Sequence, residues 1–133
     1  MSYIAKIYLN KMFKKKDCLT IDGDMLKLKV RNVLNPIPLE KPPKNIYDHF
    51  EIKGDGELIV GKGKEGPFKV VWDGKTYTSE NANEAEGKVV GLGDEYEVYF
   101  PNPGWSAGET HKLYIHIIQD RPIEITIKRT IQE

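Results

Sequence analysis

The chain has 133 residues, of which 39% are hydrophobic and 30% charged, the balance of an ordinary globular domain. Its 20 basic and 20 acidic residues cancel, so it lacks the basic excess usual in proteins that hold duplex nucleic acid. The single cysteine, Cys18, excludes an intramolecular disulfide and a cysteine-based zinc site. Frequent Lys, Glu and Ile residues are compatible with a thermophilic source.

The two signs of charge are separated along the chain. Residues 1–16 hold five Lys and no acidic residue, whereas residues 80–97 hold six acidic residues and one Lys. The sequence therefore predicts one basic end and one acidic segment.

Targeting signals are missing from the sequence as it stands. No apolar run approaches the roughly 18 residues needed to span a bilayer. Lys6, Asn10 and Lys11 interrupt the stretch that a signal peptide would need, and there is no Asn-x-Ser/Thr acceptor. We expect a cytoplasmic protein that does not bind membranes.

The first segment, residues 2–13, fits two structures equally well. Apolar residues alternate from Tyr3 to Leu9 as in a strand, while the spacing from Ile4 to Met12 fits one face of a helix. Both alternatives stay open at this point.

Beyond residue 20, alternation at period two dominates and predicts strands. In residues 25–33, Leu26, Leu28 and Val30 fall on one face and charged residues on the other. The last segment alternates as cleanly from Ile123 to Lys128. Further strands are predicted at residues 46–53, 57–60, 68–72, 75–78, 88–90, 95–100 and 112–118.

Turn signals separate these strands. Asp-Gly pairs at residues 22–23, 55–56 and 73–74, and the segment 91–94, tolerate the positive φ angles of tight turns. Residues 119–121 are predicted to close a last hairpin before Pro122, which should begin a strand. The four prolines of residues 35–43 predict an extended connection that crosses between two sheets.

Many short strands with frequent turns predict one all-β domain over residues 1–133. We favour an antiparallel β-sandwich, immunoglobulin-like or jelly-roll-like, because a single sheet would leave its apolar face uncovered. The alternative is a small closed β-barrel, and one short N-terminal helix fits either form.

Two glycine-rich motifs invite a chemical interpretation. Residues 104–108 match the G-x-S-x-G nucleophile elbow around Ser106, but a strand pattern follows, so we interpret them as a hairpin loop. Residues 61–66 match G-x-G-x-x-G, yet a strand follows here too. The loop remains a weak candidate for anion binding through Lys62 and Lys64.

The histidines and the basic run give weaker signals. His111 and His116 fall on opposite faces of one predicted strand, and His49 has no second ligand nearby, so we predict no metal site. Residues 11–16 surround Phe13 with Lys and could stack on a base, but a solvated segment is favoured. We therefore predict no cofactor and do not expect nucleic acid as a partner.

Aromatic residues carry the main functional hypothesis. Trp105 lies in a loop of small residues, where a large ring often marks a contact. The alternative is that its ring folds back and closes one end of the sandwich. If strands 95–100 and 112–118 pair, Tyr99, Tyr114 and His116 share an outer face that fits a protein or glycan.

We accordingly predict a non-enzymatic module that binds another protein or a copy of itself, since no catalytic constellation fits its context. Trp105→Ala is expected to weaken association without unfolding the chain. The alternative is a module for carbohydrates or small ligands, with Trp72, Tyr77 and Trp105 as stacking candidates.

Overall fold

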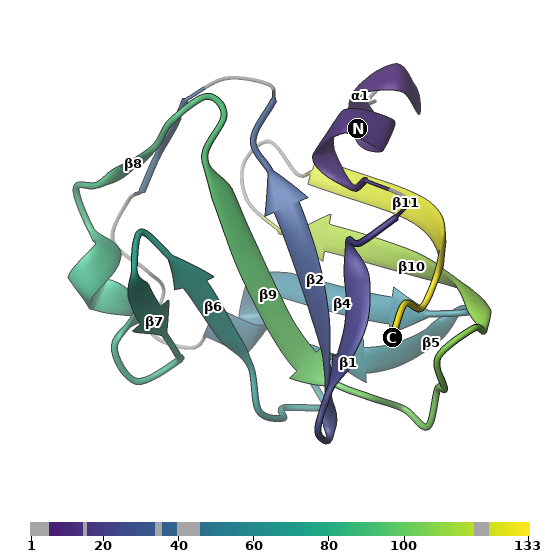
Figure 1. The fold of residues 1–133 in the computed structure, drawn as a ribbon. Helices are drawn as coiled ribbons and strands as arrows, with labels where there is room; N and C mark the ends of the chain where they lie inside the picture. The colour runs from purple at the N-terminus through teal and green to yellow at the C-terminus, as the bar shows by residue number, and fades with distance from the viewer. Residues whose placement is uncertain (1–5, 15, 34–35, 40–45, 119–122) are drawn as a thin grey trace.

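The structure, a computed structural model, describes residues 6–14, 16–33, 36–39, 46–118 and 123–133. Within these residues, antiparallel sheets stack as open layers that do not close into a barrel (Figure 1). One short helix accompanies them. The predicted all-β, sandwich-like fold with a short helix is thus confirmed, and the alternative of a closed barrel is wrong.

The first layer is a five-stranded sheet. Its alternating sequence buries Leu26, Leu28 and Val30 on the inner face and leaves the Lys and Arg residues between them more exposed. The strands in spatial order are β1 (Leu19–Asp22), β2 (Met25–Arg31), β9 (Glu95–Pro101), β6 (Lys69–Trp72) and β7 (Lys75–Tyr77).

The second layer is a four-stranded sheet whose buried residues face the first. Leu113, Ile125 and Ile127 point inward from its two longest strands and are buried. The strands in spatial order are β11 (Ile123–Thr130), β10 (Thr110–Ile117), β4 (Phe50–Gly54) and β5 (Glu57–Val60).

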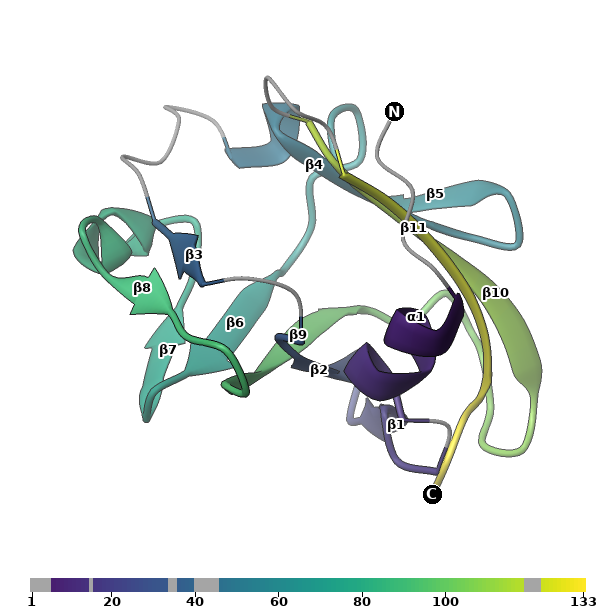
Figure 2. The same cartoon turned by 90° about the horizontal axis from the view of Figure 1, so that it is seen from above.

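A smaller unit lies beside the two layers. This unit is the ladder of β3 (Ile37–Pro38) and β8 (Val89–Val90). Of the two short 3₁₀ helices, η2 (Ala82–Ala85) contacts β7, whereas η1 (Ile46–Asp48) contacts β4 of the second layer. Figure 2 shows β3 and β8 on the side of the molecule away from β10 and β11. The proline-rich segment leads from β2 in one sheet to β4 in the other, as predicted, although residues 35 and 40–43 lie outside the described residues.

The Asp-Gly turns form as the sequence predicts. Asp55 and Asp73 have φ angles of 51° and 52°, and the glycines after them have φ angles of 89° and 73°. Two successive positive φ angles define the type I′ turn, whose twist matches that of paired strands. These turns fix the register of the β4–β5 and β6–β7 hairpins. The hairpin predicted at residues 119–121 and the strand start at Pro122 lie outside the described residues.

The helix α1 (Lys6–Met12) covers the end of the sandwich between β2 and β11 (Figures 1 and 2). Of the two alternatives for residues 2–13, the described part is helical. The reason lies in the core, where Phe13 is only 1% exposed. Arg129 of β11 donates hydrogen bonds from Nε and Nη2 to the Phe13 carbonyl, 3.1 and 2.9 Å away.

The core has two parts. The larger cluster lies between the sheets near α1 and includes Phe13, Phe100 and Leu113, each at most 1% exposed. The smaller cluster is formed by Trp72, Tyr77 and Val90 at the β7 edge of the first sheet. Tyr96 packs against both clusters.

Candidate functional site

An apolar cavity of about 330 Å³ lies at the smaller core cluster, whose Trp72, Tyr77 and Val90 line it. Its floor is the inner face of the five-stranded sheet, which contributes Val70, Trp72, Tyr77 and Tyr96. We call it the apolar cavity below. Its volume is at the lower end of the roughly 300–1,000 Å³ that ligand pockets usually span.

The walls of the apolar cavity come from the smaller elements and from the second sheet. Leu39 directly follows β3, and Val90 belongs to β8. Ala82 and Ala85 come from η2, and Ile117 is the last residue of β10. The small alanine side chains leave space where larger residues would fill it. The cavity therefore exists because η2 presents small residues to a floor of large aromatic rings.

Hydrogen bonds hold these wall elements in place. The Asn81 side chain accepts from the Thr78 amide at 2.6 Å and donates to the Thr76 carbonyl at 3.1 Å, which fastens the start of η2 to β7. Asn32, only 3% exposed, donates its side-chain amide to the carbonyls of Val90 and Gly91 at 3.1 and 3.2 Å. The wall is thus positioned by two amide side chains, that of buried Asn32 and that of partly exposed Asn81, as well as by the ladder.

The lining of the apolar cavity carries no charged side chain among the described residues. Two of its three side-chain hydroxyl groups already have protein partners. Tyr77 accepts from Lys88 Nζ at 3.1 Å, and Thr78 accepts from the Glu80 amide at 3.2 Å. The Tyr96 hydroxyl has no partner among the described residues, and the Tyr77 hydroxyl, which accepts from Lys88, keeps its own hydrogen to donate.

Tyr96 is the polar exception in the apolar cavity. Its surface is partly exposed, yet burial raises the pKa of Tyr96 to about 12. The two observations agree if the exposed surface faces the cavity rather than bulk water. No described residue forms a hydrogen bond with the Tyr96 hydroxyl, and since no buried side-chain polar atom of these residues lacks a partner, this hydroxyl retains accessible surface.

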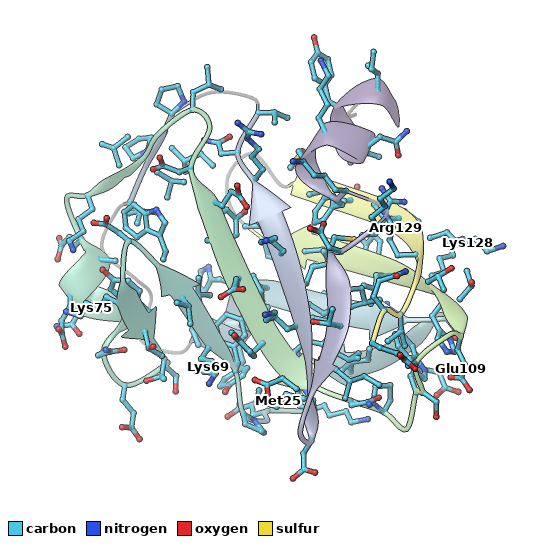
Figure 3. The ribbon with its side chains drawn as sticks, in the orientation of Figure 1. Met25, Lys69, Lys75, Glu109, Lys128 and Arg129 are labelled. Carbon is cyan, nitrogen blue, oxygen red and sulfur yellow. The ribbon has the colours of Figure 1, made fainter. Side chains whose placement is uncertain are left out.

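The four aromatic and histidine candidates of the sequence analysis do not form one surface. β9 pairs with β2 and β6, whereas β10 pairs with β4 and β11, so the expected pairing of the two strands is wrong. Tyr99 lies on the outer face of the first sheet, where Lys69 Nζ stands 4.5 Å from its ring centroid (Lys69 is labelled in Figure 3). Tyr99 is only 9% exposed.

Tyr114 and His116 do lie together, on the outer face of the second sheet. Their ring centroids are 5.8 Å apart. The Tyr114 hydroxyl donates to Glu124 Oε1 at 2.6 Å, and this bond, followed by burial, raises the pKa of Tyr114 to about 12. His116 Nδ1 lies 3.2 Å from Glu51 Oε1. Both side chains are already engaged within the sheet.

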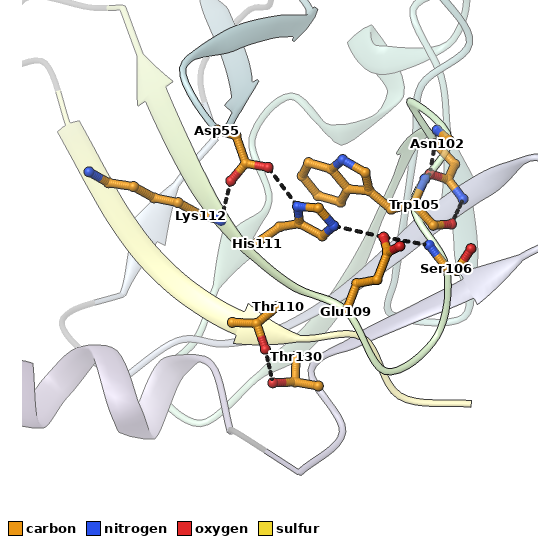
Figure 4. A network of polar contacts seen from close by, with 10 residues as sticks. Asp55, Asn102, Trp105, Ser106, Glu109, Thr110, His111, Lys112 and Thr130 are labelled. Carbon is orange, nitrogen blue, oxygen red and sulfur yellow. Dashed lines mark hydrogen bonds and ion pairs between the residues drawn. The ribbon is translucent and has the colours of Figure 1, made fainter.

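Trp105 folds back onto the protein, the second of the two alternatives for this residue. Its ring is stacked on that of His111, with centroids 3.9 Å apart and planes within 3° (Figure 4). It also covers Gly54, where an added Cβ would come within 2.5 Å of the indole. Asn102 shapes the loop, because its Oδ1 accepts from the amides of Gly104 and Trp105.

The network around His111 leaves no nucleophile at Ser106. His111 Nδ1 lies 2.6 Å from Asp55 Oδ2, and Nε2 lies 2.9 Å from Glu109 Oε1 (Figure 4). With both ring nitrogens facing carboxylates, the imidazole has no free lone pair with which to deprotonate a hydroxyl. The loop connects β9 in one sheet to β10 in the other, so it is a crossover rather than a hairpin.

The anion-binding candidates Lys62 and Lys64 lie in the loop after β5. The backbone amides of Gly61 and Lys64 donate to each other's carbonyls at 3.2 and 3.0 Å, and Lys64 Nζ donates to the Leu58 carbonyl at 3.2 Å. Two amides that an anion would need are therefore already used.

The basic N-terminal region borders a second hollow, of about 470 Å³, lined in part by Tyr8, Lys11, Lys14 and Arg31. Phe13 cannot stack on a base, because only 1% of its surface is exposed. Lys14 and Arg31 also border a small depression that contains acidic side chains, those of Asp17 and Glu95. The positive charge of this hollow is thus balanced nearby.

Other searches of the described residues give negative results. No group of three or more His, Cys, Asp and Glu side chains is placed to hold a metal ion. No helix in the described ranges has the length and apolar character to cross a bilayer. His49 is exposed, and its Nδ1 lies 3.3 Å from the Ile118 carbonyl.

Comparison with known proteins adds no family. A scan against protein-family models and a search of curated proteins both end without a match. The function must therefore be argued from the geometry of this chain.

Sequence reasoning missed Tyr96 as a site residue. The alternation of β9 places it on the inner face with Val98 and Phe100, where it looks like a core residue. A weak signal was present, because a hydroxyl on an inner face needs a partner. The cavity that exposes this hydroxyl depends on η2, which the sequence did not reveal.

Proposed function

We propose that this protein is a non-enzymatic module that binds a small apolar molecule in the apolar cavity. The observation that carries the proposal is an open space of about 330 Å³ lined without a charged side chain among the described residues. This is the alternative that the sequence analysis held beside protein binding, with an apolar ligand in place of a carbohydrate.

Water is a poor occupant of such a space. A buried water needs two to four polar partners, and two of the three lining hydroxyl groups are already engaged by protein groups. An apolar ligand would release that water and bury its own surface, at a gain of roughly 25 cal/mol for each Å² of apolar area. The lining therefore favours an apolar occupant.

A carbohydrate fits this site less well. Trp72 and Tyr77, two of the proposed stacking residues, are 8% and 7% exposed and form the cavity floor rather than an outer platform. A sugar entering the cavity would bury several hydroxyl groups, each of which costs free energy when it lacks a partner. The described lining offers few such partners: the hydroxyl groups of Tyr77, Thr78 and Tyr96 and the indole N–H of Trp72.

Binding of a protein partner or of a second copy remains a prediction from the sequence. The outer face of the first sheet supports it only weakly, because its charges are partly paired within the sheet, as between Lys27 and Glu97 at 3.2 Å. Light scattering at low and high salt would test it. A monomer at both salt concentrations would count against self-assembly.

The test of ligand binding uses the fluorescent dye 1-naphthylamine and two matched variants. Ala85→Phe places a large ring in the wall of the cavity, whereas Ala107→Phe places the same ring at an exposed loop position. We expect saturable dye binding to the native protein and to Ala107→Phe, and binding at least about tenfold weaker in Ala85→Phe. Equal binding by all three proteins, or none by any, would refute the proposal.

A further inference from the structure

Tyr96 brings a hydroxyl group to the lining of the apolar cavity. No described residue accepts a hydrogen bond from this hydroxyl. No buried side-chain polar atom of the described residues lacks a partner, so the hydroxyl has accessible surface and is not a buried, unpaired group. A ligand that brings an acceptor to this position gains a hydrogen bond that the hydroxyl does not make to the described residues.

The lining also restricts the charge of the ligand. A buried ion needs an opposite charge or several hydrogen bonds to replace its hydration. The described lining supplies no cation, and Lys88, which donates to the Tyr77 hydroxyl at 3.1 Å, is not part of it. A neutral acceptor such as a ketone, ester or ether oxygen meets both conditions.

We propose that the natural ligand is an uncharged, mainly aliphatic molecule with one oxygen acceptor, and that Tyr96 donates a hydrogen bond to that oxygen. This inference rests on the proposed function, since it names the ligand class of the same cavity. The chain of the ligand would lie over Trp72 and Val70 and against the alanines of η2, where only apolar surface is offered.

The size of the cavity guides the choice of probes. Water occupies roughly 30 Å³ in the liquid, close to one methylene group, so a space of about 330 Å³ accepts roughly eleven such groups. Octane, methyl hexyl ketone and octanoate fit within this limit. They share a chain length and differ in having no acceptor, a neutral acceptor or a charged one.

The experiment measures how well each probe displaces 1-naphthylamine from the native protein, Tyr96→Phe and Tyr77→Phe. The decisive quantity is the ratio of ketone affinity to octane affinity, which cancels general changes in the cavity. We expect this ratio to fall about tenfold in Tyr96→Phe. It should stay unchanged in Tyr77→Phe. Because the Tyr77 hydroxyl accepts from Lys88 and keeps its own hydrogen, a fall in Tyr77→Phe instead would assign the hydrogen bond to Tyr77 and refute the role of Tyr96.

A spectroscopic measurement tests the same bond directly. The carbonyl stretching frequency of bound methyl hexyl ketone should be lower in the native protein than in Tyr96→Phe, because a hydrogen bond weakens the carbonyl double bond. The frequency in Tyr77→Phe should match that in the native protein.

The other outcomes separate this inference from the proposed function. If octane and the ketone both bind and their ratio is the same in Tyr96→Phe, the role of Tyr96 is refuted while apolar binding stands. Octanoate that binds more tightly than the ketone at neutral pH would refute an uncharged ligand. If no probe displaces the dye, or no dye binds, both proposals fail.

Discussion

Trp105 and His111 stack with their ring planes within 3° of parallel, and two carboxylates hold the imidazole at its edges. The stack joins the crossover loop to β10, and Asp55 joins both to the β4–β5 turn. Asp55 also accepts the Lys112 amide at 3.0 Å. Three segments far apart in sequence therefore meet at one aromatic pair.

The charge of His111 makes this junction depend on pH. Burial opposes the charged ring, but the hydrogen bonds that the ring donates to the carboxylates of Glu109 and Asp55 outweigh burial and raise the pKa of His111. The Lys112 amide and then His111 lower the pKa of Asp55, and His111 and then the Ser106 amide lower that of Glu109. A raised histidine pKa stabilises the fold below about pH 6.5, and lowered carboxyl pKa values stabilise it above about pH 4.

His111→Phe should therefore cost most stability at mildly acidic pH, because Phe keeps the stack and removes the charge. We compare the free energy of unfolding of the variant with that of the native protein. The difference should be largest between about pH 4.5 and 6.5, and it should shrink as the pH rises through the raised pKa of His111. Urea unfolding across this range measures it. His49→Gln is the control, since His49 Nδ1 faces the Ile118 carbonyl. A difference that grows above neutral pH would contradict the assignment.

Trp105→Ala should destabilise the chain rather than only weaken association. The ring is half-buried over Gly54 and His111, so its removal leaves a void and an unstacked imidazole. We expect a loss of about 2–3 kcal/mol in the free energy of unfolding, below the range for a fully buried Trp. Trp105→Phe retains a ring and should lose clearly less. Urea unfolding of both variants is the measurement, and an unchanged stability of Trp105→Ala would show that the ring is not packed.

Arg129→Met should release α1 from the sandwich. Arg129 is 7% exposed and donates to the Phe13 carbonyl and to Asn10 Oδ1, at 3.2 Å for the latter (Figure 3). Met retains the apolar stem but leaves that carbonyl without its donor, at a cost of about 2–3 kcal/mol. Hydrogen exchange should rise first in α1 and β1, ahead of β10.

The control is Lys128→Met, at the exposed neighbouring residue, which should change the free energy of unfolding by no more than about 0.5 kcal/mol. Global loss of protection without a local effect at α1 would argue against this role.

The alternation of the strands and the Asp-Gly turns made most of the fold predictable. Residues 57–60 form β5 as predicted, and the other expected strands form with shifts of a few residues. The exception is residues 46–48, which form η1. β1 was missed because it has only four residues and Ile21 in it is exposed, so its alternation is weak.

The candidate site was less predictable, for physical reasons. Period-two alternation tells which face a residue takes but not which strands become neighbours, so Tyr99 and Tyr114 were placed on one surface although they lie on different sheets. The role of Arg129 follows from α1 packing over β11, a long-range contact that no local pattern encodes. The apolar cavity depends on where Ala82 and Ala85 of η2 are placed.

Tyr96→Phe should leave the ligand-free protein about as stable as before. Since the Tyr96 hydroxyl makes no hydrogen bond to a described residue and is not a buried, unpaired group, its removal breaks no such bond. We expect the free energy of unfolding to change by no more than about 0.5 kcal/mol. Tyr114→Phe is the contrasting control, because it loses the bond to Glu124 and should be less stable by about 1 kcal/mol. Thermal and urea unfolding of the two variants, without ligand, measure these changes in the free energy of unfolding. A loss of more than about 1.5 kcal/mol in Tyr96→Phe would mean that the hydroxyl is bonded within the protein, and it would then not be available to a ligand.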